Sequence, residues 1–237
     1  MKLALCLLMI AVAILMIAYP VQAEGKEVDA SKTGGLPLVE GWHWQYSLLA
    51  EDQDPTGKET ATIKVGENEN IEVKVKKISA VIKTVISKVE ENENFIMVTF
   101  DYKQSSQQWS QKNYWLLNKN SGYLWNSEAS FVNCFNSKAD PPSNDPFLIL
   151  PLKVGDGWGE DPEFKRDDHW YQWYVEEEET ITVPAGTFKC LRLAYRCNPD
   201  HELIWFCPNV GIVKQEYVHH GSIANMFMEL TSYGIEK

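Results

Sequence analysis

The sequence predicts an all-β protein, mainly antiparallel, built as a single curved sheet, a half-barrel or a barrel-like sheet with little helix. Two observations lead to this fold class. Short runs of alternating apolar and polar residues recur along the chain, as expected for strands with one buried face. Glycine, proline, asparagine and aspartate separate these runs at short intervals, which is typical of antiparallel hairpins.

Residues 1–23, MKLALCLLMIAVAILMIAYPVQA, predict a secretory signal peptide. Lys2 precedes a long apolar run, and the short side chains of Val21 and Ala23 fit cleavage after Ala23. No second long apolar run follows, so the mature chain is not expected to be an integral membrane protein. We expect export to the periplasm or the extracellular space, with residues 24–237 forming a single mainly antiparallel β domain.

Aromatic and β-branched residues mark the segments that are expected to form strands. "IEVKVKKI" (71–78) alternates apolar with charged residues and predicts a half-buried strand. The segment 78–91 also fits helical spacing, but its many β-branched residues favour a strand. "LIWFC" (203–207) is apolar throughout, which predicts a strand covered on both faces. Three further segments follow the strand pattern: 94–102, 113–126 and 169–183.

Turn sequences separate these strands. Residues 54–57 and 183–186 share a pattern in which proline presets φ at the second position and glycine takes a positive φ at the fourth. Both therefore predict hairpins, and Pro184 and Gly186 are the structural turn residues of the second. Two further hairpin sequences are 118–122 and 198–201, whereas 133–145 and 156–168 predict surface loops.

Four cysteines remain after cleavage of the signal peptide, and an oxidising compartment allows them to form disulfides. Four thiols permit three pairings. Three of the cysteines lie in one predicted hairpin, so the preferred bridge joins Cys190 to Cys207, which leaves Cys134 and Cys197 as the second pair. Their spacing matches no common zinc pattern. We expect no metal site and no cofactor.

Catalytic and metal motifs are incomplete wherever the sequence begins to match one. "EDQDPTG" (51–57) resembles the opening of a calcium loop, but Ile63 stands where the bidentate glutamate belongs. "HELIW" starts like a zinc-protease motif, but Trp205 replaces the second histidine. No G-x-S-x-G element occurs in the chain. We therefore expect no catalytic residues and a protein that is not an enzyme.

Acidic residues outnumber basic ones, and removal of Lys2 changes the formal charge from −11 to −12. Such a charge repels phosphate groups, so nucleic acid is not an expected partner. The acidic run 176–179 is expected to protect a sheet edge from pairing with other chains. The alternative for this run is a surface that binds a cation or a basic partner.

Aromatic residues are the strongest candidates for a binding surface. Trp42, Trp44 and Tyr46 share one face of a predicted strand, because successive strand side chains alternate between faces. Trp170 and Trp173 fall on opposite faces of another predicted strand. Large flat apolar groups on a curved sheet suit an acyl chain or a sugar, and core packing is the alternative. These five residues are the candidate ligand-binding set.

Four motifs in order, LPLKVGDGW, ETITVPAGTFKCLRL, IWFCPNVGIVKQEY and MELTSYGIE, resemble a broad group of uncharacterised exported bacterial proteins. The resemblance covers the C-terminal third to half of the chain. It implies a highly curved antiparallel sheet, similar to the half-barrels of periplasmic lipoprotein carriers, and it implies no catalytic residue. The group commonly has a small residue at the position of Cys207, so this cysteine is a departure that points to a local disulfide.

These observations favour an exported, non-enzymatic binding protein that holds a hydrophobic or lipid ligand on a curved β-sheet. The first alternative is a structural or interaction protein of the cell envelope or surface, with an envelope protein as partner and no small-molecule ligand. A glycan-acting enzyme ranks third, because paired carboxylates cannot be recognised without geometry. An apolar concavity open to solvent between the tryptophan-bearing strands would support the first reading.

Overall fold

The computed structural model describes residues 33–65, 69–107, 110–126, 130–139, 146–159 and 167–235, so the predicted signal peptide lies outside the described residues. The described chain forms strands and one short helix. They are β1 (Trp42–Gln53), β2 (Glu59–Val65), β3 (Glu69–Glu91), β4 (Phe95–Gln104), β5 (Ser110–Asn118), β6 (Tyr123–Asn126), α1 (Ser130–Ser137), β7 (Leu148–Ile149), β8 (Gly157–Trp158), β9 (Trp173–Val183), β10 (Gly186–Arg196), β11 (Asp200–Cys207), β12 (Gly211–His219) and β13 (Ala224–Ile235).

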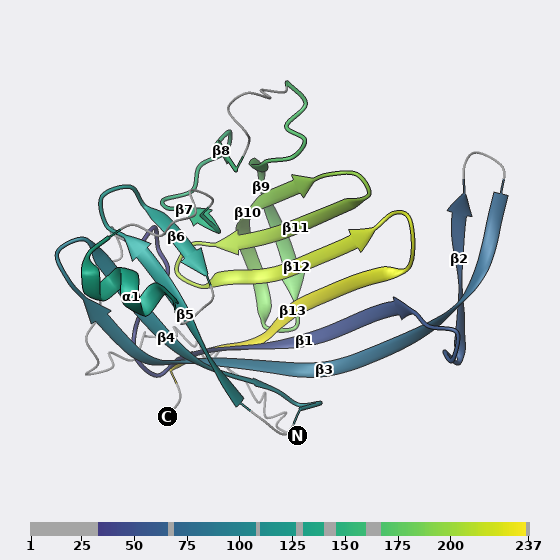
Figure 1. Ribbon diagram of the computed structural model, residues 1–237, viewed down its shortest axis with the longest axis horizontal. Helices are drawn as coiled ribbons and strands as arrows, with labels where there is room; N and C mark the ends of the chain where they lie inside the picture. The colour runs from purple at the N-terminus through teal and green to yellow at the C-terminus, as the bar shows by residue number, and fades with distance from the viewer. Residues whose placement is uncertain are drawn as a thin grey trace, which may run out of the picture.

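One antiparallel sheet contains every described strand, in the order β7-β6-β5-β4-β3-β1-β13-β12-β11-β10-β9-β8, with β2 paired to β3 (Figure 1). The sheet curves until its two end strands approach each other. The indole Nε1 of Trp158 on β8 donates a 3.0 Å hydrogen bond to the carbonyl of Pro146, just before β7. The sheet is therefore a nearly closed barrel with one seam, which confirms the predicted all-β fold class.

The strand predictions for 71–91, 94–102, 113–126 and 203–207 are confirmed by β3, β4, the β5–β6 pair and β11. In β11, the last four residues are all buried, as expected for a strand covered on both faces. The 78–91 segment is a strand and not a helix, because its β-branched side chains pack on the pleated surface against β1 and β4.

The prediction for 169–183 was wrong at its start, because β9 begins only at Trp173. His169 and Tyr171 have φ angles of 58° and 64°, which no strand residue adopts. Trp170 therefore lies on a loop beside the sheet and not on a strand face.

The turn at 54–57 forms, but it does not make the predicted hairpin. Gln53 of β1 and Glu59 of β2 both register with Val75 of β3, so the intervening residues loop out from one side of β3. The amide of Gly57 donates a 2.8 Å hydrogen bond to the carbonyl of Asp54. A Cβ on Gly57 would lie 2.2 Å from the carbonyl oxygen of Val75. Glycine is therefore required here because the turn packs closely against β3, and not because of a positive φ.

Residues 133–145 were predicted as a surface loop, yet their first part belongs to α1. Val132 and Phe135 stand three residues apart, so both reach one face of the helix. They pack against a second buried cluster on the sheet, which consists of Phe95, Met97, Leu116 and Trp125. Apolar contact with the sheet thus makes a short helix where proline-rich sequence suggested only a loop.

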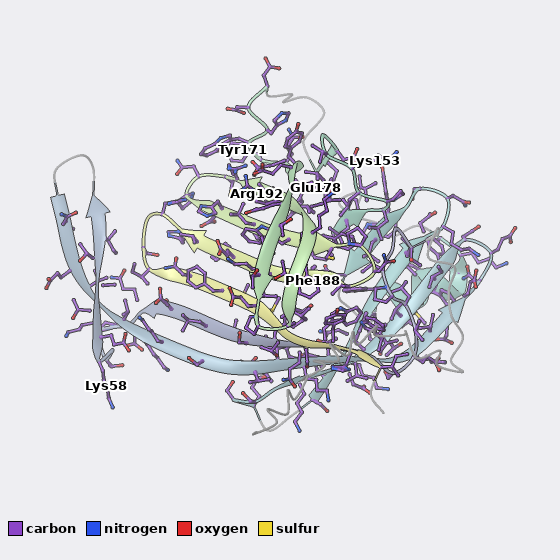
Figure 2. All side chains as sticks on the ribbon, turned by 180° about the vertical axis from the view of Figure 1, so that it is seen from behind. Lys58, Lys153, Tyr171, Glu178, Phe188 and Arg192 are labelled. Atoms are coloured by element: carbon purple, nitrogen blue, oxygen red, sulfur yellow. The ribbon has the colours of Figure 1, made fainter. Side chains whose placement is uncertain are left out.

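The β9–β10 hairpin closes the barrel interior. Its turn is the predicted one, with Gly186 at a φ of 141°. The amide of Ala185 at the tip donates a 3.0 Å hydrogen bond to the carbonyl of Leu230 on β13. β12 pairs with β13 only over 214–217 and 226–229. The hairpin crosses β12 and docks on β13 beyond that ladder, as Figures 1 and 2 show.

A two-stranded arm extends from the barrel, formed by β2 and the first half of β3 (Figure 1). Two ion pairs hold the base of the arm. The ammonium group of Lys77 lies 3.2 Å from the carboxylate of Glu51 on β1 and 3.0 Å from that of Glu59 on β2. Among the described strands, β2 pairs only with β3. The arm therefore contributes little to the buried core.

Candidate functional site

A pocket of about 250 Å³ opens on the face of the sheet that carries Trp44 and Tyr46. The strand register brings its walls together: Trp44 of β1 faces Thr84 of β3, and Thr84 faces Tyr102 of β4. The far wall comes from β12 and β13. The pocket is lined by Trp44, Tyr46, Thr84, Phe100, Tyr102, Asn113, Trp115, Asn126, Phe147, Ile212, Gln215 and Met228.

Aromatic rings form the floor of this pocket. The Trp44 ring lies 6.2 Å from that of Phe100 and 6.1 Å from that of Trp115, measured between centroids. Phe100 and Trp115 meet edge to face at 4.5 Å. Such arrangements add to the free energy gained by burial, and they hold the rings in fixed orientations. The floor is therefore a rigid aromatic surface.

Trp44 and Tyr46 also span the barrel interior. The indole Nε1 of Trp44 donates a hydrogen bond to the carbonyl of Val210, and the hydroxyl of Tyr46 donates one of 2.8 Å to the carbonyl of Ile212. Both side chains are buried. Burial raises the pKa of the Tyr46 hydroxyl, so the group stays a neutral donor.

The polar part of the lining is uncharged. It consists of the side chains of Thr84, Asn113, Asn126 and Gln215 with the hydroxyls of Tyr46 and Tyr102, and none of the twelve lining residues is charged. The amide Nε2 of Gln215 donates a hydrogen bond to the carboxylate of Glu202 outside the pocket. Burial raises the pKa of Glu202 above its usual range, and this hydrogen bond opposes the rise only in part.

The five predicted ligand-binding residues do not form one site. Trp44 and Tyr46 line the pocket. Trp42 lies beside Trp44, with 6.3 Å between ring centroids, but it is not part of the lining. Trp173 is stacked on Trp158 of β8 with centroids 6.3 Å apart, and Trp170 lies on the loop before β9. These last two belong to the seam side of the barrel.

Sequence reasoning missed four aromatic residues of the lining, namely Phe100, Tyr102, Trp115 and Phe147. Alternation along β4 places Phe100 and Tyr102 on one face, and this signal is present in the sequence. The register that sets them against Trp44 depends on the pairing of β3 with both β1 and β4. Such long-range pairing cannot be read from local alternation.

A second and larger hollow, of about 680 Å³, lies on the opposite face of β1, β3, β12 and β13. Its side chains include Val81, which is 43% exposed, together with Leu49 and Phe227. Two carboxylates on its wall, Glu216 and Glu229, lie 2.8 Å and 3.9 Å from the ammonium group of Lys214. Both carboxylates are thus engaged by one cation of the chain.

The acidic run 176–179 lies on β9 and is paired along the sheet. Glu176 forms ion pairs with Arg192 and Arg196, and Glu179 accepts a 2.9 Å hydrogen bond from the indole of Trp205. Burial alone would raise the pKa of Glu176, but the hydrogen bond and charge of Arg196, with Arg192, lower it below its usual range. Arginines of the neighbouring strand thus neutralise part of the run, which leaves less charge for binding a cation, and protection of the sheet edge stays a prediction.

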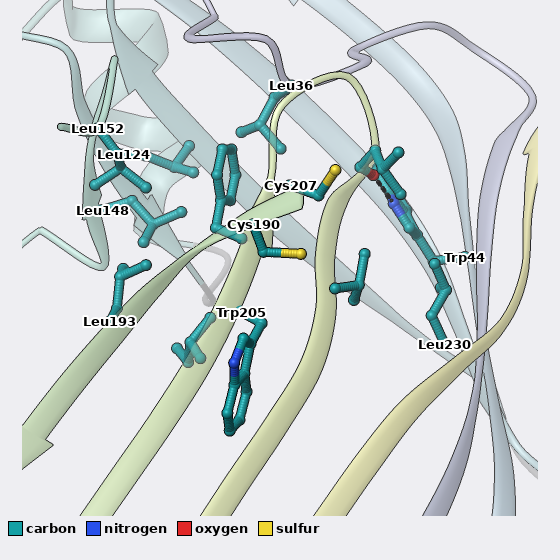
Figure 3. Packing of buried hydrophobic residues seen from close by; sticks show 14 of the residues in the cluster. Leu36, Trp44, Leu124, Leu148, Leu152, Cys190, Leu193, Trp205, Cys207 and Leu230 are labelled. Atoms are coloured by element: carbon teal, nitrogen blue, oxygen red, sulfur yellow. Dashed lines mark hydrogen bonds between the residues drawn. The ribbon is translucent and has the colours of Figure 1, made fainter. Parts of the chain in front are cut away.

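The four cysteines are free thiols in the structure. Cys190 and Cys207 lie side by side on β10 and β11 and share a hydrogen bond, which with burial raises the pKa of the Cys190 thiol (Figure 3). Cys134 lies on α1 and Cys197 follows β10, and Figure 1 places these two elements well apart.

In the described residues, no group of three or more His, Cys, Asp or Glu side chains has the arrangement of a metal site.

No helix within the described parts of the chain is long and apolar enough to cross a membrane.

Known proteins resemble this chain only in part. No curated protein matches it. Two solved structures are similar to it: a protein of Bacteroides fragilis, described as exported and as having a YmcC-like fold, and a protein of Parabacteroides distasonis, described as a lipoprotein. Each is 14% identical to this chain, and each match covers 84% of this chain. The matches cover 96% of the Bacteroides fragilis chain and 97% of the Parabacteroides distasonis chain. The TM-scores are 0.46 and 0.43.

The DUF3108-like family model matches residues 171–224. That range contains β9 to β12 and two of the four motifs described above, ETITVPAGTFKCLRL and IWFCPNVGIVKQEY. The β9–β12 segment of this chain is therefore similar to the DUF3108-like family.

Proposed function

We propose that this protein is an exported, non-enzymatic binding protein that holds the apolar part of a neutral ligand in the pocket floored by Trp44, Phe100 and Trp115. The observation that carries the proposal is the lining, which combines aromatic and aliphatic side chains with three uncharged amides and three hydroxyls, those of Tyr46, Thr84 and Tyr102. Ligand pockets combine predominantly apolar walls with a small number of polar groups that set orientation. A charged ligand would lose its hydration without gaining an ionic partner.

The size of the pocket limits what it holds. Its volume of about 250 Å³ lies just below the range of roughly 300–1,000 Å³ that is typical of small-molecule sites. The pocket therefore suits one ring system or a short acyl segment more than a complete lipid. Asn113, Asn126 and Gln215 supply hydrogen-bonding groups for a polar end.

The same lining supports the non-enzymatic part of the proposal. Acid–base and nucleophilic catalysis need a carboxylate, histidine, cysteine, lysine or comparable group within reach of the ligand. The lining has no carboxylate, histidine, cysteine or lysine, and burial raises the pKa of its two tyrosines, Tyr46 and Tyr102, which keeps both hydroxyls protonated. Export is supported by the composition of residues 1–23, and amino-terminal sequencing of the mature protein from its host would test it.

Binding of a fluorescent probe tests the pocket. The neutral probe N-phenyl-1-naphthylamine is expected to bind with enhanced emission, and more tightly than the anionic 8-anilinonaphthalene-1-sulfonate. Thr84→Trp adds a bulky ring within the pocket, whereas Thr62→Trp adds the same ring on the exposed surface of β2. We expect the first variant to weaken binding about tenfold or more, equal to about 1.4 kcal/mol, and the second to leave it unchanged.

Equal binding by both variants, or a preference for the anionic probe, would contradict the proposal. Native mass spectrometry after gentle purification gives an independent measurement, in which a retained small molecule is expected. If neither experiment detects a ligand, the alternative of an interaction protein is favoured. The hollow on the opposite face, with Val81 exposed, is the observation that supports this alternative.

A further inference from the structure

The loop before β9 presents two aromatic rings to solvent. Trp170 is 36% exposed and Tyr171 is 46% exposed, and their ring centroids lie 6.2 Å apart. Figure 2 shows Tyr171 near the top of the view, well away from the arm at the left. Neither residue lines the pocket of the proposed function. The pair is thus a separate surface feature.

The backbone of this loop is strained. In the described chain, four residues other than glycine have a positive φ, and His169 and Tyr171 are two of them, with φ angles of 58° and 64°. A left-handed conformation is sterically unfavourable for a residue with a Cβ, and it is uncommon for aromatic residues. Strain of this kind persists only where surrounding contacts over-determine it, and it is concentrated at functional sites.

Contacts beneath the two rings hold the strained loop in place. The amide of Tyr171 donates a 2.7 Å hydrogen bond to the carbonyl of Arg196. The buried amide of Gln172 lies 3.0 Å from Nδ1 of His169, and the His169 ring stacks on Tyr174 at 3.8 Å with 6° between the planes. The loop therefore presents its exposed rings in a fixed arrangement, so ligand binding would cost little conformational entropy.

We propose that Trp170 and Tyr171 form a platform that binds a neutral oligosaccharide. One face of a pyranose ring carries apolar C–H groups with a partial positive charge, which complements the negative face of an aromatic ring. Asp167, three residues before Trp170 in the sequence, is exposed, and its carboxylate oxygens can accept hydrogen bonds from sugar hydroxyls. The two rings are tilted by 57° to each other, so each ring would stack on its own sugar unit.

Size and charge favour a neutral sugar over other occupants. A stable protein interface buries about 800 Å² per partner, which is more than two partly exposed side chains provide. An anionic membrane surface is disfavoured by the exposed carboxylate of Asp167 and by the formal charge of −11 of the whole chain. A neutral ligand carries no such electrostatic penalty.

Calorimetric titration with cellotetraose and chitotetraose tests the platform. We expect binding of at least one of the two by the unmodified protein. We expect Trp170→Ala and Tyr171→Ala each to weaken it about tenfold or more, while Trp170→Phe, which keeps a ring, retains most of it. Tyr233→Ala removes another partly exposed aromatic ring, on β13, and is expected to leave the affinity unchanged.

Absence of binding to both oligosaccharides at millimolar concentration would overturn this proposal. Binding that is equally strong in the alanine variants would also overturn it, as would sedimentation with phosphatidylcholine vesicles in place of sugar binding. The pocket probe should bind all platform variants equally, because the two sites share no residue. Loss of the sugar site and loss of the pocket are therefore distinguishable.

Discussion

The hydroxyl of Tyr46 on β1 donates a 2.8 Å hydrogen bond to the carbonyl of Ile212 on β12, so one side chain joins two strands that do not pair with each other. Tyr46→Phe is expected to lower the free energy of unfolding by about 1–3 kcal/mol, because the Ile212 carbonyl is left without this partner. Urea unfolding at neutral pH measures the change. Tyr233→Phe, on a partly exposed ring, serves as the control and is expected to have little effect.

Alkaline pH should destabilise the protein through the same hydroxyl. Burial raises the pKa of Tyr46 in the folded state above its value of 10.0 for the free group. The stability that this group contributes is therefore complete below about pH 10 and is lost as the pH rises toward the folded-state pKa. Denaturant unfolding between pH 8 and pH 11 should show a steeper loss in the unmodified protein than in Tyr46→Phe. Parallel pH profiles for the two proteins would refute this assignment.

Replacement of Glu202 by glutamine is expected to stabilise the fold near pH 7. Burial raises the pKa of this carboxyl above its ordinary value of 4.5, so its favourable contribution is present in full below that pH. The contribution is lost as the pH rises through the folded-state pKa, and the charged form carries a penalty. Glu202→Gln keeps an acceptor for Gln215 and should raise the unfolding free energy by about 1 kcal/mol at pH 7.

The advantage of Glu202→Gln should disappear below about pH 4, where the carboxyl of the unmodified protein is also neutral. Glu178→Gln is a suitable control, because Glu178 pairs with Lys189 on an exposed surface where ion pairs contribute little. Destabilisation of Glu202→Gln at pH 7 would show that the charged carboxylate is needed by its surroundings.

Oxidation is expected to join Cys190 to Cys207. The two thiols already share a hydrogen bond between neighbouring strands, and Leu191 registers with Phe206 beside them. Oxidised glutathione accepts the two electrons, and both thiols lose their protons as the disulfide forms. A crosslink over a loop of this length is expected to stabilise the fold by roughly 3 kcal/mol.

Thiol labelling of the denatured, unreduced protein measures this pairing. Two labelled cysteines are expected after oxidation, namely Cys134 and Cys197, and Cys190→Ser should show three. Four labelled cysteines after exposure to the oxidant would rule out the bridge. Peptide mapping identifies which two residues are protected.

Local patterns predicted most of the strands, because the alternation and the residue types that favour a strand can be read from neighbouring residues in the sequence. The alternation in 71–78 and the β-branched residues of 78–91 describe one long strand, β3. The turn at 54–57 shows where such reasoning stops. Its sequence specifies a local bend, but whether the flanking strands pair with each other or both pair with Val75 is decided by β3.

Only two of the twelve lining residues, Trp44 and Tyr46, were predicted as ligand-binding residues, for the same reason. Alternation along β1 places Trp44 and Tyr46 on one face, whereas the opposing carbonyls of Val210 and Ile212 belong to residues 166 positions away. Trp170 and Trp173 were assigned to one strand because the segment is rich in aromatics. The positive φ angles of His169 and Tyr171 depend on contacts with Arg196 and Tyr174, which the local sequence does not reveal.

The arm of β2 and β3 has a consequence for handling the protein in solution. β2 has no described neighbour other than β3, so one long edge of the arm carries unpaired backbone donors and acceptors. Such edges recruit strands from other molecules. Lys74 and Lys76 are exposed cations on β3 beside the exposed carboxylate of Glu72, but the formal charge of −11 on the whole chain makes two approaching molecules repel each other. We expect salt to screen this repulsion, so concentrated samples should stay dispersed at low ionic strength and self-associate as it is raised.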